Sequence, residues 1–461
     1  MHSSSSRGIV TLSAKTVGPT LEVCYGIIPE VPIHSLGYSR LRKLEFMSLP
    51  IVILPTDEKW SCHQCGICCK GSLVPLNNDD VARLQSQKWN EHPDLRETVV
   101  MVRNRWFKKG FRLAQRADGS CVFLTENGLC RIHAELGYDS KPTICRVFPL
   151  QLVPRNGKVA LTLRRACPSS AADKGSALKE HLPFVQQFVR EGRLSTKAID
   201  PPAFKTGEFR DWKIIGLALE TASQLLQDQR YPPVRRMVHA LQFANLVSKA
   251  KTKHMDVRKL AELIETLAQI VPEETKPFFS DRRPPGTYAN VLFRSICVEY
   301  ARLHPGFQAK PTWSHRFRLA RTLIRLIDGR GRLPNCEPAF PPGQFGDLEH
   351  SLGQMSTLLE YPLARLIEAS SASYVYALAD RQGWSIVDSI RGLVALFPIG
   401  LWLLRWSAIG RNPTAEDMIQ IVVALDRGQG FAPLTGQLQR MRLHLLSTHS
   451  ELERLVVWYA R

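Results

Sequence analysis

The chain has 461 residues, of which 44% are hydrophobic and 22% are charged, a composition that excludes a disordered or collagen-like protein. A chain of this length favours two or three domains over a single core. The 61 Lys and Arg residues outnumber the 42 Asp and Glu residues and give a formal net charge of +19, which suits anionic partners but does not by itself identify one.

Residues 1–46 begin with a serine tract and show no sustained periodicity, so they are predicted to form a flexible leader. A start codon assigned too far upstream would explain this leader, because Met47 opens a stretch that is more typical of a domain start. The leader lacks a basic region followed by an apolar core and a cleavage site, so no secretory signal is predicted. We therefore expect a cytoplasmic location, where clustered cysteines more often bind metal or act in catalysis than form disulfides.

Residues 47–175 are predicted to form a small cysteine-rich metal-binding domain with short β-hairpins. This segment holds eight of the 11 cysteines, and these are the candidate metal ligands: Cys62, Cys65, Cys68, Cys69, Cys121, Cys130, Cys145 and Cys167. The first three have C-x2-C-x2-C spacing, which brings thiolates to one face of a tight turn in zinc and iron–sulfur sites. The remaining cysteines of the chain, Cys24, Cys297 and Cys336, are isolated and are expected to be ordinary thiols.

Two Asn-Gly pairs predict tight turns that bring further thiols together. The first lies inside the sequence "CVFLTENGLC" and should place Cys121 close to Cys130. The second, at residues 156–157, separates two apolar runs and predicts a hairpin. Pairing about this turn would set Cys145 almost opposite Cys167, at the open end of the hairpin.

Eight thiols suffice for two four-thiolate sites, or for one site with additional cysteines around it. Ligand type does not distinguish zinc from an iron–sulfur cluster, because both accept four thiolates. Adjacent side chains in an extended backbone point to opposite faces, so we expect Cys68 to complete the set of Cys62 and Cys65. Cys69 would then join a second set from the other four cysteines. The alternative is a group of buried structural or regulatory thiols.

The rest of the chain is predicted to be helical. Apolar residues recur at helical spacing through residues 176–330, which are expected to form a helical domain, and through residues 348–461, a second helical subdomain. Residues 331–347 are rich in Pro and Gly and are predicted to be a linker. The longest apolar run, "GLVALFPIGLWLL", is shorter than the roughly 20 residues that span a membrane, so it is predicted to be a buried helix of a soluble protein. The fold class expected is therefore α+β.

The cysteine pattern resembles that of the CxxCxxCC family, whose members are described as zinc- or iron-chelating domains. The shared features are Trp60 two positions before "CHQCGICC", followed by "CVFL", "GLCRI", "CRVFP" and the Cys167-Pro168 pair. They cover about residues 58–170. A more distant resemblance connects "CVFLTENGLCRIHAELG" and the helical half to the flagellin lysine N-methylases. This second resemblance implies an iron–sulfur-dependent protein lysine N-methyltransferase that uses S-adenosylmethionine.

The function expected is that of a metal-binding protein, with zinc or an iron–sulfur cluster held by thiolates and a helical region that docks a protein partner or protein substrate. The sequence contains no P-loop, no dinucleotide-binding glycine motif and no H-E-x-x-H or G-x-S-x-G motif, so no catalytic residue is assigned. Trp and Tyr residues show no base-stacking register, which argues against nucleic acid as the partner. S-adenosylmethionine is expected only if the methyltransferase alternative holds.

Overall fold

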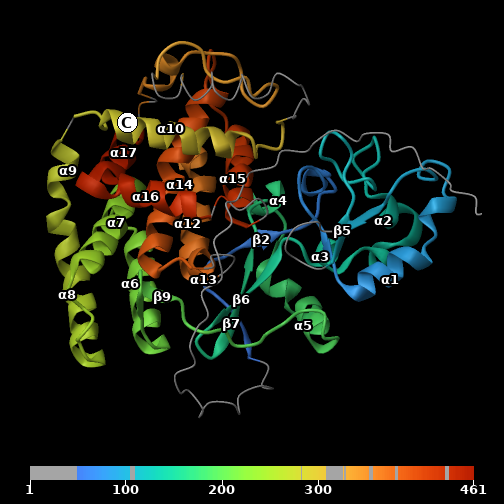
Figure 1. Cartoon of the computed structure of the whole chain (residues 1–461), viewed down its shortest axis with the longest axis horizontal. Helices are drawn as coiled ribbons and strands as arrows, with labels where there is room; N and C mark the ends of the chain where they lie inside the picture. Colours follow the sequence, from blue (N-terminus) through green and yellow to red (C-terminus); the bar gives the residue numbers. More distant parts are fainter. Residues whose placement is uncertain are drawn as a thin grey trace, which may run out of the picture. The chain divides into compact units, whose positions relative to one another are not determined.

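The short strands precede residue 210 and the long helices follow it, in the computed structural model described here (Figure 1). This arrangement confirms the predicted α+β class. The structure describes residues 49–103, 110–281, 283–307, 325, 329–351, 353, 357–378, 383–430, 434 and 436–461. Residues 48–461 group into one compact unit, and the predicted leader, with Cys24, lies outside the described residues.

A three-stranded sheet of order β1-β7-β6 carries the second predicted turn. Its strands are β1 (Ile51–Ile53), β6 (Leu150–Arg155) and β7 (Lys158–Leu163). Strands β6 and β7 pair antiparallel with Arg155 opposite Lys158, and Gly157 supplies the positive φ of 69° that the two-residue turn requires. The predicted hairpin is confirmed. Figure 1 shows β6 and β7 beside helices α12 (Thr357–Ser373) and α13 (Val375–Leu378).

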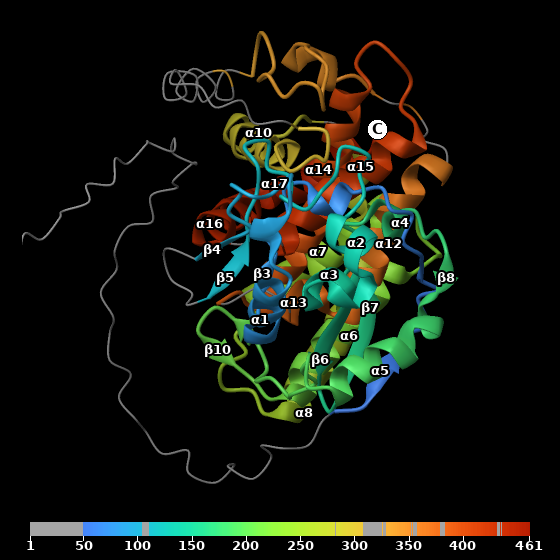
Figure 2. The same cartoon turned by 90° about the vertical axis from the view of Figure 1, so that its right-hand side faces the viewer.

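A second three-stranded sheet, of order β3-β5-β4, lies beside helix α1 in the cysteine-rich region (Figure 2). The remaining elements of this region are short: η1 (Ile67–Cys69), β2 (Lys59–Trp60), β3 (Pro75–Leu76), α1 (Asn78–Ser86), η2 (Trp89–Glu91), β4 (Met101–Arg103), β5 (Phe111–Leu113), α2 (Arg131–Leu136), η3 (Tyr138–Ser140), α3 (Thr143–Val147), α4 (Pro168–Ala171), β8 (Ser176–Ala177), η4 (Leu178–His181), α5 (Leu182–Arg190), β9 (Ala203–Lys205) and β10 (Glu208–Phe209). Helix α1 begins with a capping box between Asn77 and Asp80, which satisfies main-chain N–H groups of its first turn.

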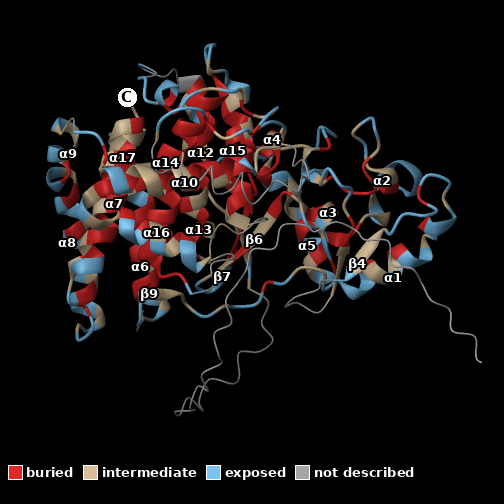
Figure 3. Cartoon of the chain, turned by 45° about the horizontal axis from the view of Figure 1, so that its top comes forward, coloured by how far each residue is buried: buried red, intermediate tan, exposed pale blue. Residues whose placement is uncertain are grey.

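The predicted helical region contains a series of long helices around one hydrophobic core. Besides α12 and α13 they are α6 (Trp212–Gln227), α7 (Pro233–Lys249), α8 (Val257–Glu274), α9 (Lys276–Ser280), α10 (Thr287–Ala301), η5 (Phe345–Leu348), α14 (Ile386–Ser407), α15 (Ala415–Gly430), α16 (Gln437–Leu446), η6 (Thr448–Ser450) and α17 (Glu451–Tyr459). Helix α14 lies at the centre and contacts α7, α15, α16 and α17. Figure 3 shows the buried residues concentrated in α14 and α15, whereas α8 presents an exposed face.

Helix α14 contains the longest apolar run, and every one of its residues is buried. It is the one helix, among the described residues, that is long and apolar enough to cross a membrane, and its apolar window is entirely enclosed by protein. The prediction of a buried helix is therefore confirmed. The helix extends beyond the apolar run and includes Arg391 and Arg405, which are also buried. Asn245 and main-chain carbonyls accept their hydrogen bonds.

Residues 331–347 contain no long helix, and Arg332 pairs with Gln344 through an isolated bridge. Phe340 and Phe345 from this segment are buried in the same hydrophobic core as the helices on either side. The division of the helical region into two parts at this segment stays a prediction. The helices on both sides of the segment share one hydrophobic core.

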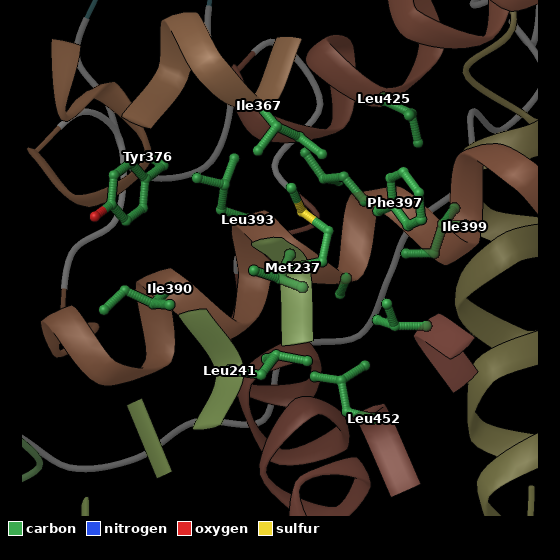
Figure 4. Packing of buried hydrophobic residues seen from close by; sticks show 14 of the residues in the cluster. Met237, Leu241, Ile367, Tyr376, Ile390, Leu393, Phe397, Ile399, Leu425 and Leu452 are labelled. Atoms are coloured by element: carbon green, nitrogen blue, oxygen red, sulfur yellow. The ribbon is translucent and has the colours of Figure 1, made fainter. Parts of the chain in front are cut away.

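Substitution of Leu393 by alanine should destabilise the protein by about 2–5 kcal/mol, because it leaves a cavity at a position that is 1% exposed. Figure 4 shows Leu393 among Ile367, Ile390 and other apolar side chains of the core. Chemical denaturation measures this loss. Leu438→Ala on α16 is the matched control, since a leucine that is 53% exposed should change the free energy of unfolding by less than about 0.5 kcal/mol.

Candidate metal centre

The sequence "CHQCGICC" forms an open loop that ends in the short helix η1. Gly66 precedes η1 with a φ of 67°, and a Cβ atom at this position would lie 2.6 Å from the carbonyl oxygen of Gly128. A glycine is therefore required both by the backbone conformation and by the close approach of the two chain segments. The result is that the loop rests against the turn between Cys121 and Cys130.

Main-chain hydrogen bonds fix the end of this loop to the segment that carries Cys121. The amide of Cys121 donates to the carbonyl of Cys69 at 2.8 Å, and the amide of Gly71 donates to Gly119 at 2.9 Å. Further along, Leu124 pairs with Cys130 through an isolated bridge. The predicted turn is confirmed, because Gly128 has a φ of 77° and the chain reverses between the two cysteines.

Cys68 and Cys69 do not diverge as expected. Their sulfur atoms are 4.0 Å apart, because residues 67–69 form a 3-10 helix and not the extended backbone on which the expectation depended. The neighbouring Cys69 thiol, followed by desolvation, raises the pKa of Cys68 well above its usual value. Cys69 packs against the same small core as Cys121, Cys130 and Cys145, so both adjacent cysteines face the other thiols.

Burial and mutual repulsion oppose ionisation of the thiols around this core. Burial raises the pKa of Cys121 to about 11, and negative charge on Cys130 and Cys68 contributes to this rise. Burial raises the pKa of Cys145 further still. Three other thiols add to the rise at Cys145 when they are charged: Cys121, Cys130 and Cys68. The four sulfurs therefore form one electrostatically connected group that comes from three separate chain segments.

Cys145 and Cys167 are carried on short helices beyond the open end of the β6–β7 hairpin. The pairing of strands β6 and β7 ends at Leu150 and Leu163. Cys145 and Cys167 lie beyond this point, so they do not face each other as paired strand residues. Cys145 lies in α3, and Cys167 caps the N-terminus of α4. Burial raises the pKa of Cys167 to about 11, and negative charge on Cys68 contributes to the rise.

The loop is more exposed than the rest of the candidate site, and Cys68 is exposed as well as Cys62 and Cys65. Cys62 and Cys65 are both exposed, and charge on Cys62 contributes, after burial, to the raised pKa of Tyr138, which is about 12. Ser169, two residues after Cys167, donates to the carbonyl of Ser61 at 2.7 Å. This hydrogen bond fixes the start of the loop beside helix α4.

Trp60 lies next to Cys167 in the structure. Its indole nitrogen is buried and has no partner at ordinary hydrogen-bond geometry, but a weaker interaction of the indole N–H with the Cys167 sulfur acts to lower the pKa of that thiol, against the stronger effect of burial. An indole N–H is a donor only, so a thiolate at Cys167 would give it an acceptor.

The donor chemistry fits a soft metal centre, because thiolates are the ligands that zinc and iron–sulfur clusters prefer. Within the part of the chain that the structure describes, no three His, Cys, Asp or Glu side chains are grouped closely enough to hold a metal ion. Ligation therefore requires the sulfurs to move together from the positions seen here.

Two residues of helix α15 contact the site and were not found from the sequence. Asp426 accepts hydrogen bonds from the amide of Ala166 at 2.8 Å and from Arg164 at 3.0 Å. Arg427 donates to the carbonyl of Ile67 at 2.8 Å. The only sequence signal was a charged pair at the end of an apolar helix, and spacing along the chain could not indicate which distant segment it would meet.

Comparisons with known proteins agree with the cysteine pattern. Residues 61–168 match the family model CxxCxxCC, described as "Putative zinc- or iron-chelating domain". The chain is similar to two uncharacterized proteins of Methanocaldococcus jannaschii. The first, MJ0939, is 31% identical over 135 residues, which are 29% of this chain and 44% of the relative. The second, MJ0661, is 28% identical over 104 residues, which are 22% of this chain and 51% of the relative.

The chain thus spans about half the length of the curated relatives that it matches. No solved structure matches it. Residues 61–168 match the CxxCxxCC family model, so the resemblance noted in the sequence is confirmed for this segment.

Proposed function

We propose that the cysteine region binds zinc or an iron–sulfur cluster through thiolates, and that the helical region docks a protein partner or protein substrate. The observation that carries the metal proposal is the electrostatic connection of Cys68, Cys121, Cys130 and Cys145, which come from three chain segments. Thiols of one electrostatically connected group repel one another when they are ionised, and a bound cation removes that repulsion. The family match supports metal binding in general terms.

The ligands proposed first are the four connected thiols and Cys69, which packs against the same core. Cys62 and Cys65 would reach the metal by closure of the exposed half of the loop. Cys167 would join from helix α4, with the Trp60 indole N–H as a donor to its sulfur. Eight thiols in this arrangement suit either one cluster with surrounding cysteines or two adjacent centres.

The alternative, an iron–sulfur-dependent protein lysine N-methyltransferase, stays a prediction. It would require S-adenosylmethionine to bind in a manner that depends on the cysteine cluster. Binding of this cofactor by the wild-type protein, and its loss on removal of the cluster, would distinguish the enzyme from a metal-binding protein that only docks a partner.

Cys145→Ser should cause loss of most of the bound metal, because it removes one sulfur of the proposed ligand group. The effect of three other thiols on the pKa of Cys145 supports its inclusion in this group. Anaerobic purification followed by measurement of iron, zinc and acid-labile sulfide gives the metal content, and the sulfide value distinguishes a cluster from zinc. Cys297→Ser is the matched control, since Cys297 is buried in α10 away from the cluster. Equal metal content in the two variants, both folded, would contradict the proposed ligand set.

The metal-free protein should lose stability as the pH rises from about 9 to about 11. Cys121 and Cys167 have folded-state pKa values raised to about 11, so the unfolded chain releases protons first and is favoured as the pH rises through this window. Differential scanning calorimetry in the presence of a chelator measures the effect. The double variant Cys121→Ala and Cys167→Ala should show a smaller fall in melting temperature over the same pH range, and an identical fall would refute the assignment.

A further inference from the structure

Arg427 is a buried cation that projects from helix α15 toward the cysteine loop. Its side chain donates to the carbonyl of Ile67 at 2.8 Å and to the carbonyl of Leu303 at 3.2 Å, and the residue is 6% exposed. Its Nε atom is buried and has no hydrogen-bond partner. Among the described residues Arg427 forms no ion pair with a carboxylate.

A buried guanidinium without a carboxylate is unusual, because the charge loses its hydration and gains only neutral acceptors in return. The carbonyl that Arg427 holds belongs to Ile67, the residue immediately before Cys68. The cation is thus fixed beside a thiol of the proposed ligand group.

The neighbouring Asp426 holds the other side of the site. It accepts from Arg164 and from the amide of Ala166, and Cys167 follows directly in the sequence. Gly430, at the end of the same helix, is packed against Arg164, since a Cβ atom there would lie 2.2 Å from the guanidinium. Adjacent residues of one helix therefore position two loops that carry proposed ligands.

We propose that Arg427 is a positioning residue of the thiolate centre. It holds the turn of residues 67–69 in place from the helical region and places a positive charge beside Cys68, where metal binding creates a thiolate. The inference rests on the proposed metal-binding function. A positive charge at this point favours the ionised ligand set, in the way that outer-shell partners of metal ligands do.

The test measures zinc affinity of the full-length protein by competition with a chromophoric chelator under anaerobic conditions. Arg427→Gln should weaken zinc binding about 10- to 100-fold, because it removes the charge and keeps a donor for the Ile67 carbonyl. Arg427→Lys retains the charge without the two-armed hydrogen bonding, so it should recover most of the affinity while its metal-free melting temperature stays below that of the wild type.

Arg405→Gln is the matched control. Arg405 is also a buried arginine that donates to main-chain carbonyls, including that of Tyr459. It lies in α14, where it contacts the C-terminal residues of the chain and not the cysteine loop. This variant should lower the melting temperature and leave zinc affinity within about twofold of the wild type, as expected for a distant and independent site.

Equal zinc affinity in wild type and Arg427→Gln would overturn the inference and leave metal binding intact. An equal loss in Arg405→Gln, or an undiminished loss in a folded Arg427→Lys, would also overturn it, since stability and not charge would then control affinity. If Arg427→Gln does not fold, the Arg427→Lys result decides alone. A wild-type protein that binds neither zinc nor iron would refute the proposed function itself, and the inference with it.

Discussion

The attachment of the cysteine region to the helices depends on ion pairs centred on the buried Arg165. This side chain pairs with Glu58 at 3.4 Å and with Asp173 at 3.0 Å, and Asp173 also accepts from Arg365 of helix α12 at 3.1 Å. Arg165 is only 1% exposed, so removal of both acidic partners would leave its buried charge without compensation. The segment that leads into Cys167 is therefore fixed to Glu58, directly before strand β2, on one side and to the helical region on the other.

The apolar clusters of the cysteine region are small. Its apolar side chains are divided between two small clusters, one around Trp89 and Phe123 and one around Phe188. Ile67 and Ala171, from the two loops that carry cysteines, pack instead against the large helical core. The candidate metal centre thus lies where a small, locally folded region is completed by contacts from distant helices, which include Asp426 and Arg427.

Because helices contact the loops that carry cysteines, the ionisation of the thiols depends in part on the helical region. The sulfurs resist ionisation because they are buried and close together, and the cations that oppose this effect come partly from outside the cysteine-rich segment. Lys141 acts to lower the pKa of Cys145 and of Cys68 from within the region, whereas Arg427 of helix α15 donates to the carbonyl of Ile67, next to Cys68. A metal centre here would be sensitive to the packing of α15, and a partner bound to the helices would have a physical route to affect it.

The sequence by itself determined the features that depend on short-range interactions. The turns at residues 127–128 and 156–157, the long helices and the burial of the apolar run in α14 follow from local backbone preferences and from hydrophobic periodicity, which need no knowledge of distant residues. Tertiary structure decided the features that depend on distant partners. The 3-10 turn that brings the Cys68 sulfur to 4.0 Å from the Cys69 sulfur depends on the contact of Gly66 with Gly128. The role of Arg427 depends on its contact with Ile67, some 360 residues away in the chain. Pairings of this kind leave no periodic signal, because each requires only one residue of the right charge or size at a position that the folded chain brings near.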